Sequence, residues 1–396
     1  MKHRILAILA VFCLSSCYML RAYKVRHFKL TDHQKLPSVP VSAAEQPFLF
    51  TEATAASSYS RLQNFLDSNL ASSLTAAFLV IKNDSIIYER YFGGFDRSSL
   101  LPSFSVAKSF VSTLIAIAVD EGKIKSLQEP VTNYLPELQK RDRRFSKITL
   151  QHLLDMRSGI RFNEGGYGLK DDAIKLGFRP NLRKHSLKLM IEKDPGGDFN
   201  YQSINTELLA LCLEEATGKK ISAYLQEKIW QPLGMEYGAT WNTDGKKRKQ
   251  EIAFAGLNAT ARDFAKIGKL YLDKGSWKGK QILASSWTEL PANKDTMDKW
   301  DGYKNQWWGN FNYSFIKDSA VSPEYLAALS ARFQVTKVSN AYRVASSSGA
   351  FHAQGILGQF VYINPANRVI IVRLGRYWSH PKWYAAGFID AVGRQL

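Results

Sequence analysis

The sequence contains very little cysteine. Only Cys13, Cys17 and Cys212 occur among 396 residues. Cys212 lies in the apolar run Leu208–Leu213, which predicts a small buried side chain rather than a reactive thiol. Because a single cysteine remains in the part of the chain that folds, no disulfide framework is predicted, and the lack of a Cys/His cluster gives no indication of a zinc site.

The N-terminus lacks a hydrophobic run long enough to cross a bilayer. Met1–Arg4 is basic and Ile5–Leu14 is apolar, and a stretch of this length is typical of a signal peptide. Leu14–Cys17 then matches the bacterial lipobox, in which the cysteine is lipidated and becomes the new N-terminus. We therefore expect a protein of the bacterial cell envelope that is anchored in a membrane through Cys17. A plain secretory signal with a chance cysteine is the alternative.

Acidic residues are scarce relative to basic ones. The chain has 35 Asp and Glu against 53 Lys and Arg, so its formal net charge is +18. Such an excess often indicates nucleic-acid binding. The basic residues are spread along the chain, however, and an exported lipoprotein seldom meets nucleic acid, so we expect no nucleic-acid partner. A solvated basic face is the simplest interpretation, and attraction to anionic envelope surfaces is the alternative.

Strand patterns occur near both ends of the chain, with helical patterns between them. Residues 77–81 and 86–92 flank a turn, and residues 358–363 and 369–374 form a second hairpin pattern. The predicted fold class is α+β, with an antiparallel sheet built from N- and C-terminal segments, flanking helices and an inserted helical lobe. We expect a signal peptide over 1–16, a lipid-anchored tether and lead-in over 17–57, and one domain over 58–396 with the helical lobe at about 129–255.

The most informative motif is the pair Ser105 and Lys108, at the start of an apolar run that ends before Gly122. Positions i and i+3 share one helix face, so the lysine amine can reach the serine hydroxyl. A lysine at the mouth of a buried helix is desolvated, which lowers its pKa and lets it act as a base. A serine hydroxyl is a poor nucleophile until such a base takes its proton.

The spacing alone is weak evidence. Ser314 with Lys317 and Ser379 with Lys382 have the same spacing, but neither pair opens an apolar helix. Taken alone, Ser105 and Lys108 are equally well explained as a helix cap and a solvated lysine.

Two further segments contain the groups that a serine–lysine hydrolase needs. Tyr201 lies in a loop before the apolar run at Leu208, where its phenol can shuttle a proton; a buried, hydrogen-bonded tyrosine is the alternative. In the segment Phe351–Gln359, glycines allow a strand edge to approach a substrate closely. A backbone N–H on that edge, together with the N–H of Ser105, would form an oxyanion hole.

The order of these parts resembles the serine β-lactamase, DD-peptidase and esterase superfamily, and within it the class C-like branch. The resemblance begins at about residue 77 and runs to the C-terminus. It rests on further segments at 148–154, 158–160, 230–235 and 256–263. It implies a β-lactamase/transpeptidase-like fold that acts without metal or cofactor. It further implies that Ser105 is acylated, that Lys108 is the base, that Tyr201 relays the proton, and that the N–H of Ile356 is the second oxyanion donor.

Two departures from the family pattern bear on the substrate. Ser203 stands where the family has asparagine, and Ala353 stands where it usually has a lysine or histidine. Because β-lactam enzymes use that cation to recognise the drug carboxylate, its loss argues against penicillin as the natural substrate.

Residues 302–308 and 355–359 resemble instead the 6-aminohexanoate-dimer hydrolases and related carboxylesterases. In that branch we expect Ser203, Gly355, Tyr167 and Trp307 to contact the substrate. An ordinary loop aromatic is the alternative for Tyr167.

The sequence thus predicts an exported, lipid-anchored serine hydrolase that cleaves an ester or a small amide through an acyl-Ser105 intermediate. One alternative is a penicillin-binding protein, DD-peptidase or weak β-lactamase that acts on cell-wall peptides or β-lactams. The other is a non-catalytic envelope binding module built on a retired hydrolase fold.

Overall fold

The computed structural model describes residues 18, 21–23, 25, 29–53, 56–166, 168, 171–289, 291, 302–379 and 384–396. Its largest sheet has the strand order β10-β11-β13-β14-β15-β3-β4-β2, with β12 paired to β13. All pairs in this sheet are antiparallel except the short parallel pair of β2 and β4. The strands of this sheet are β2 Thr51–Glu52, β3 Thr75–Lys82, β4 Ser85–Tyr91, β10 Tyr303–Lys304, β11 Trp307–Lys317, β12 Gln334–Val338, β13 Ala341–Gly355, β14 Gln359–Asn364 and β15 Val369–Gly375.

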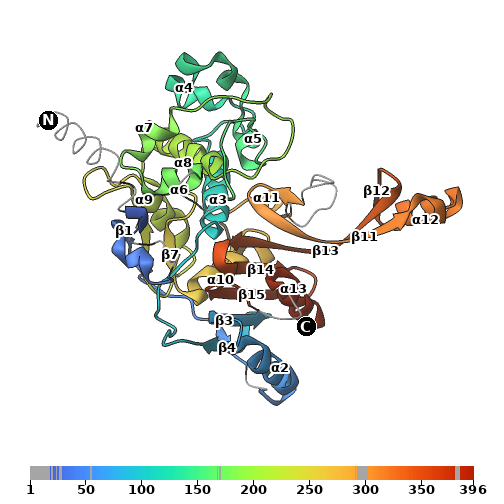
Figure 1. Cartoon of the computed structure of the whole chain (residues 1–396). Coiled ribbons are helices and arrows are strands. Elements are labelled where there is room, and N and C mark those ends of the chain that lie inside the picture. Colours follow the sequence, from blue (N-terminus) through green and yellow to red (C-terminus); the bar gives the residue numbers. More distant parts are fainter. Residues whose placement is uncertain are drawn as a thin grey trace, which may run out of the picture.

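The α+β prediction is confirmed, because the sheet joins strands from both ends of the chain and helices cover it (Figure 1). Both predicted hairpins are present, as β3–β4 and β14–β15. The turn between β3 and β4 places Asn83 and Asp84 at φ 48° and 62°, a backbone region that these two residue types tolerate better than most.

Helices lie on both faces of the sheet, which explains why its central strands are apolar without strict alternation. Leu79 of β3 and Val372 of β15 pack in one core cluster with α3 and α10, whereas Phe78 and Ile371 pack in a second cluster with α2 and α13. The helices are α2 Ser60–Leu70, α3 Val106–Asp120, α4 Pro136–Arg141, α5 Leu150–Leu154, α6 Asp172–Phe178, α7 Leu182–Ser186, α8 Ser203–Thr217, α9 Ile221–Leu225, α10 Ala261–Leu272, α11 Ser285–Glu289, α12 Pro323–Arg332 and α13 Ala385–Gln395.

A four-stranded sheet connects the lead-in segment to the body of the domain, in the order β1-β6-β7-β5. Its strand β1 and the edge strand β2 of the large sheet both come from the segment predicted as a lead-in. A two-stranded sheet joins β8 and β9. The strands of these two sheets are β1 Ser38–Val41, β5 Leu101–Pro102, β6 Ala239–Asn242, β7 Leu257–Ala259, β8 Ser276–Trp277 and β9 Lys280–Gln281.

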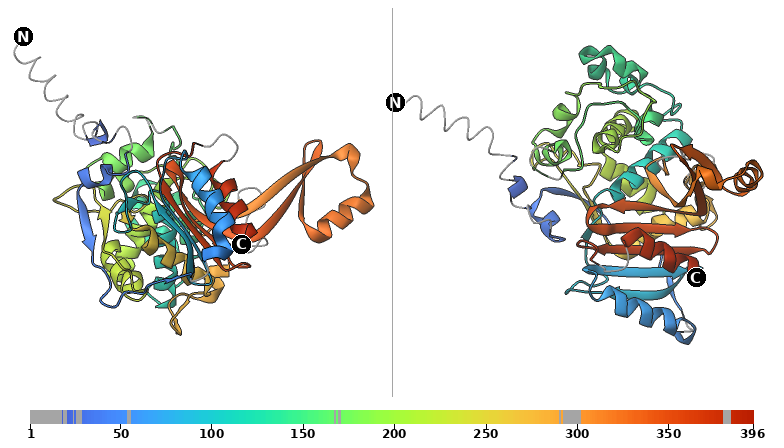
Figure 2. Two further views of the ribbon diagram at one scale, coloured as in Figure 1. Left: turned by 90° about the horizontal axis from the view of Figure 1, so that it is seen from below. Right: turned by 45° about the vertical axis from the view of Figure 1, so that its right-hand side comes forward.

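An arm that the sequence analysis did not predict projects from the large sheet. Strands β11 and β13 continue beyond the body of the domain, and α12 and β12 lie at the far end of the arm (Figure 2). The register of β11 on β13 shifts between Gly309 and Phe311. Within the described residues, every helix is too short or too polar to traverse a bilayer.

Helix α3 is surrounded by protein on all sides. It packs against α8, α9, β13 and β14, and its residues from Val106 to Ala118 are buried. The predicted apolar helix that begins at Ser105 and ends before Gly122 is therefore present. Its first turn, which carries Ser105 and Lys108, therefore lies between the large sheet and the helices that pack beside it.

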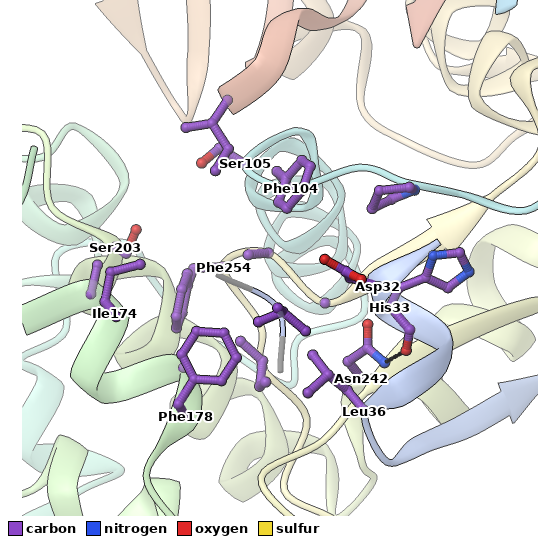
Figure 3. Close-up of a pocket in the computed structure, with 18 of the residues that line it drawn as sticks. Asp32, His33, Leu36, Phe104, Ser105, Ile174, Phe178, Ser203, Asn242 and Phe254 are labelled. Atoms are coloured by element: carbon purple, nitrogen blue, oxygen red, sulfur yellow. Dashed lines mark hydrogen bonds between the residues drawn. The ribbon is translucent and has the colours of Figure 1, made fainter. Parts of the chain in front are cut away.

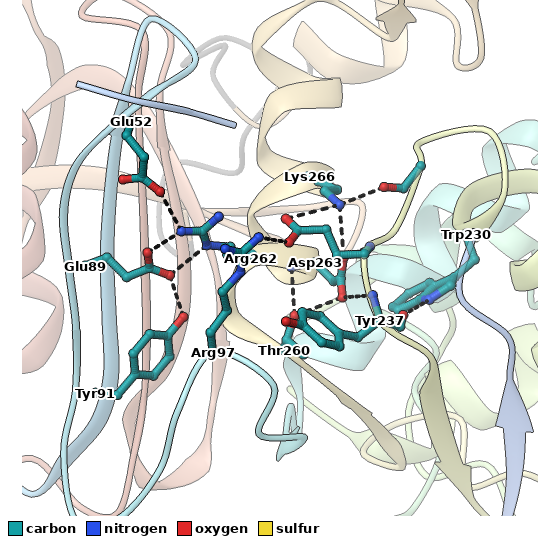
Figure 4. A network of polar contacts seen from close by, with 12 residues as sticks. Glu52, Glu89, Tyr91, Arg97, Trp230, Tyr237, Thr260, Arg262, Asp263 and Lys266 are labelled. Carbon is teal, nitrogen blue, oxygen red and sulfur yellow. Dashed lines mark hydrogen bonds and ion pairs between the residues drawn. The ribbon is translucent and has the colours of Figure 1, made fainter. Parts of the chain in front are cut away.

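Helix α10 carries charged residues, and these are buried together with its apolar residues. Arg262 Nε donates to Glu89 Oε1 at 2.8 Å, and its Nη2 donates to Glu52 Oε1 at 2.8 Å. Lys266 Nζ donates to Asp263 Oδ1 at 3.1 Å, one turn away. These ion pairs form the network in Figure 4, in which the pairs of Arg262 join α10 to the edge of the large sheet.

We expect Arg262→Met to lower the free energy of unfolding by about 3 kcal/mol, because it leaves Glu89 without its cation in a largely buried position. The midpoint of urea denaturation measures this loss. Lys193→Met removes the exposed partner of Asp198 and should leave the midpoint unchanged. Equal midpoints for Arg262→Met and the unaltered protein would contradict the role given to this network.

Candidate active site

Ser105 lies at the start of α3 in a tightly constrained turn. Phe104, which precedes it, has φ 45°, a left-handed conformation that is costly for an aromatic residue. The N–H groups of Ala107 and Lys108 donate to the carbonyls of Phe104 and Ser105 at 3.0 and 3.1 Å, so the first helical turn is closed directly after the strained residue. Ser105 is thereby held at a helix N-terminus, where backbone N–H groups point outward.

Lys108 is almost completely removed from water, with 1% of its surface exposed. Its Nζ donates to Ser105 Oγ at 2.8 Å and to the carbonyl oxygen of Phe254 at 3.2 Å. Burial lowers the pKa of Lys108 to about 8, and the negative charge of Glu164 opposes this shift. A lysine with this pKa has a substantial neutral fraction in mildly alkaline solution and can accept the serine proton.

Tyr201 completes the contacts around the serine hydroxyl. Its phenol hydrogen-bonds Ser105, and its ring centroid lies 5.0 Å from Lys108 Nζ. Burial raises the pKa of Tyr201, so the phenol keeps its proton at neutral pH. Of the two groups beside Ser105, Lys108 is therefore the one suited to accept a proton, and Tyr201 is suited to donate one.

An aromatic cluster fixes the ring of Tyr201. Trp308 stacks on it with ring centroids 5.7 Å apart and an interplanar angle of 25°, and Tyr303 meets it edge-on at 5.9 Å. The turn at Asn305 and Gln306, between these two aromatic residues, is bound to α3, because Ser109 Oγ donates to the Gln306 carbonyl at 2.7 Å.

Gly355 is the last residue of β13 and lies against the start of α3. A Cβ at this position would lie 2.4 Å from the carbonyl oxygen of Ser103 and 3.1 Å from the backbone nitrogen of Ser105, so only glycine fits. Ile356 follows directly and lines the same cavity as Ser105. The backbone of 355–356 thus lies beside the N–H of Ser105, as an oxyanion hole requires.

Arg373 holds the turn Ile356–Gly358 that follows β13. Its guanidinium is fully buried in β15 and donates to the carbonyls of Leu357 and Gly358 at 2.9 and 2.6 Å. Burial lowers its pKa to about 9. Leu357 has φ 64°, a conformation that these bonds help to maintain. Arg373 was not predicted from the sequence, since a lone arginine in an apolar strand belongs to no motif.

Ser203 was predicted to contact substrate, and the structure places it at the start of α8 beside an acidic residue. Its Oγ donates to Glu164 Oε1 at 2.6 Å, and its backbone N–H donates to Glu164 Oε2. Both residues line the cavity that contains Ser105. Glu164 was not singled out in the sequence; its only signal was its place in the glycine-containing loop that also carries Tyr167.

The structure corrects the substrate contact predicted for Trp307. Its side chain is fully buried in the core, and its Nε1 donates to the hydroxyl of Tyr271 at 3.0 Å. Successive strand residues point to opposite faces, so Trp308 instead lies against Tyr201. Tyr167 and Cys17 lie outside the described residues.

Ala353 lies on β13 with its methyl group buried, paired with Val361 of β14. The position where the family usually has a cation therefore presents no charged group to the site. In the described part of the chain, no cluster of His, Cys, Asp or Glu side chains is arranged to hold a metal ion.

A family model described as beta-lactamase matches residues 62–378 of the chain. The 6-aminohexanoate-dimer hydrolase of Paenarthrobacter ureafaciens is 29% identical over 61% of this chain and 66% of its own length. Esterase EstB of Burkholderia gladioli is 30% identical over 40% of this chain and 45% of its own. The chain therefore spans just under two thirds of the first relative and less than half of the second.

A solved structure from Bacillus anthracis, assigned as a 6-aminohexanoate-dimer hydrolase, resembles the whole fold. It superposes with a TM-score of 0.70 at 27% identity and covers 95% of this chain and 94% of its own.

We expect the rate at which a fluorophosphonate labels Ser105 to rise with pH and to level off above a midpoint near the pKa of Lys108, about 8, because only the neutral amine accepts the serine proton. Glu164→Gln removes the negative charge that raises this pKa, so its midpoint should move to lower pH. Labelling followed by mass spectrometry between about pH 6 and pH 10 measures both midpoints.

Glu137→Gln replaces an exposed carboxylate on α4 and is the matched control, with an unchanged profile expected. A midpoint for Glu164→Gln at or above that of the unaltered protein would refute the electrostatic coupling of Glu164 to Lys108.

Proposed function

The chain belongs to the beta-lactamase family, and on this premise we propose that it is a serine hydrolase that cleaves neutral esters or small amides through an acyl-Ser105 intermediate. The observation that carries the proposal is the 2.8 Å contact between Ser105 Oγ and a Lys108 amine whose pKa is lowered by burial. The two relatives named as a 6-aminohexanoate-dimer hydrolase and an esterase support this reaction class.

The proposed reaction begins when neutral Lys108 takes the proton of Ser105 and the serine oxygen attacks the carbonyl carbon. The backbone N–H groups of Ser105 and Ile356 stabilise the resulting oxyanion. The bond to the leaving group then breaks while Tyr201 donates its proton to the departing oxygen or nitrogen and recovers one from Lys108. Water, deprotonated in the same way, hydrolyses the acyl-Ser105 ester and restores the serine.

The absence of a cation at Ala353 favours a neutral substrate over a β-lactam or a cell-wall peptide. Both of those substrate types carry a carboxylate on the leaving-group side of the scissile amide. The buried methyl group of Ala353 offers no cation to bind that carboxylate. An uncharged ester does not need such a cation.

We further propose that the protein is exported and anchored to a membrane of the bacterial envelope through a lipidated Cys17. The basic start, the short apolar run and the lipobox at residues 14–17 support this proposal.

Ser105→Ala should reduce the turnover of p-nitrophenyl acetate by at least about 1,000-fold, because it removes the atom that is acylated. Ser379→Ala is the matched control. Ser379 has a lysine three residues later but is exposed, so its loss should leave turnover unchanged. Undiminished turnover by Ser105→Ala would refute the assignment of the nucleophile.

Cys17→Ala should abolish the mass increase of an N-terminal lipid and shift the protein out of the membrane fraction of an expressing bacterium, because the sulfur atom that carries the lipid is lost. Detergent phase partitioning and intact-protein mass spectrometry measure the two effects. Cys13→Ala removes a cysteine from the same segment and should change neither. A lipid mass that persists in Cys17→Ala would contradict the anchor.

A further inference from the structure

A cavity extends from Ser105 away from the aromatic cluster and toward the lead-in segment. Its volume is about 140 Å³, and the space continues into open solvent. Figure 3 shows Ser105 at its upper rim, with Phe178 and Leu36 on the opposite side and Phe254 between them. The walls come from four distant parts of the chain: Leu36 belongs to the lead-in, Phe178 to α6, Phe254 to the loop between β6 and β7, and Ile356 to the turn after β13.

The surface of this cavity is mainly hydrocarbon. Besides Phe254 and Phe178, the aliphatic side chains of Ile174, Ile252 and Leu36 line it. The acidic groups on its rim are already used within the protein. Asp32 accepts from the Lys29 N–H at 2.8 Å and from Lys35 Nζ at 2.6 Å, and Asp171 caps α6 by accepting from the N–H groups of residues 173 and 174. Glu164, the third acidic residue in the lining, accepts from Ser203 Oγ at 2.6 Å. The binding free energy of a ligand in this cavity would therefore come chiefly from burying apolar surface.

The position of Tyr201 decides which half of a substrate enters the cavity. Tyr201 gives its proton to the leaving group, so the leaving group must lie on the side of Tyr201 and Trp308. Neither of these residues lines the cavity, whereas Ser105 and Ile356 do. The acyl carbon bonds to Ser105 and its oxygen points toward Ile356, which leaves the cavity as the space for the rest of the acyl group.

We propose that this cavity binds a medium-length, unbranched hydrocarbon acyl chain, so that the preferred substrates are esters of aliphatic carboxylic acids. This inference rests on the proposed function of Ser105. In the reaction the ester C–O bond breaks, the acyl carbon bonds to Ser105 Oγ, the alcohol leaves with a proton from Tyr201, and water releases the fatty acid. The cavity takes no part in these bond changes; it selects the acyl chain by burying its methylenes.

A larger side chain at Gly177 would shorten the cavity. It lies in α6 with ordinary helical φ, and a Cβ there would meet the ring of Phe254 at 3.6 Å, which is a normal van der Waals contact. A leucine at this position fits the backbone and extends its side chain into the space that the acyl chain would occupy. Replacement of Phe178 by a smaller residue would lengthen the cavity, because its ring forms part of the far wall.

The test compares kcat/KM for p-nitrophenyl esters from acetate to dodecanoate. Each methylene that moves from water into the cavity raises kcat/KM by up to about fourfold, so we expect octanoate to exceed acetate by at least about 30-fold. Gly177→Leu should lower the octanoate-to-acetate ratio by at least about tenfold. Phe178→Ala should move the preferred ester to a longer chain, a gain that misfolding cannot produce.

Gly245→Leu is the matched control, because a Cβ at Gly245 meets nothing within 4 Å and this residue is not part of the cavity lining. Its ester ratio should equal that of the unaltered protein. A flat profile from acetate to octanoate, or a ratio that Gly177→Leu leaves unchanged, would overturn the acyl cavity. A chain-length dependence that appears only with alkyl acetates, where the alcohol is varied, would also overturn it.

Failure of the proposed function gives a different result. In that case no ester is hydrolysed in a Ser105-dependent way and no fluorophosphonate labels the serine, whatever the chain length. Hydrolysis that depends on Ser105 but is indifferent to the acyl chain would therefore refute only the cavity proposal.

Discussion

The burial of one ammonium group is the constraint on which the site depends. Lys108 emerges from a helix whose neighbours are all protein, so water cannot solvate its charge, and its partners are the Ser105 hydroxyl and the Phe254 carbonyl. Two neutral dipoles compensate a charge less well than water or a carboxylate does, which is why the pKa falls. A carboxylate in direct contact with Lys108 would stabilise the charged ammonium group, and no neutral amine would then be present to act as the base. Glu164 instead contacts Ser203 and influences Lys108 from a distance, so it moderates the shift without abolishing it.

The groups around Ser105 are held by elements that are themselves fixed by buried polar contacts. Phe254 follows Ala253, whose N–H donates to the buried Glu207 at 3.0 Å, so the loop that carries the Lys108 acceptor is tied to α8. Arg373 fixes the turn after Gly355 through carbonyl oxygens. Neither Glu207 nor Arg373 has to touch a substrate. Each sets the backbone from which a group near the serine extends, and a shift of that backbone would misplace the group.

The predictable parts of this structure were those encoded by local patterns. The two hairpins, the buried helix of Ser105 and the α+β class follow from apolar periodicity and turn residues, each within one segment. The choice between Trp307 and Trp308 was not predictable, because adjacent strand residues face opposite sides and the sequence does not reveal which side is the core. Glu164 and Arg373 act through contacts with residues 39 and 16 positions away, and no motif marks either one. The arm of β11 and β13 was also missed, since its strands extend past any partner that the hairpin patterns indicated.

The chemistry and the selectivity of the site have different origins in the chain. The nucleophile and the base are three residues apart and share one helical turn, so a short motif contains both of them. The proposed acyl cavity is assembled from the lead-in, α6, the loop at Phe254 and the turn at Ile356, which meet only in the folded protein. Substitutions in any of these four segments can reshape the cavity while the contact between Ser105 and Lys108 stays in place. A family that keeps this helical turn can therefore change substrates without changing its mechanism, and for this reason the substrate has to be inferred from the cavity rather than from the motif.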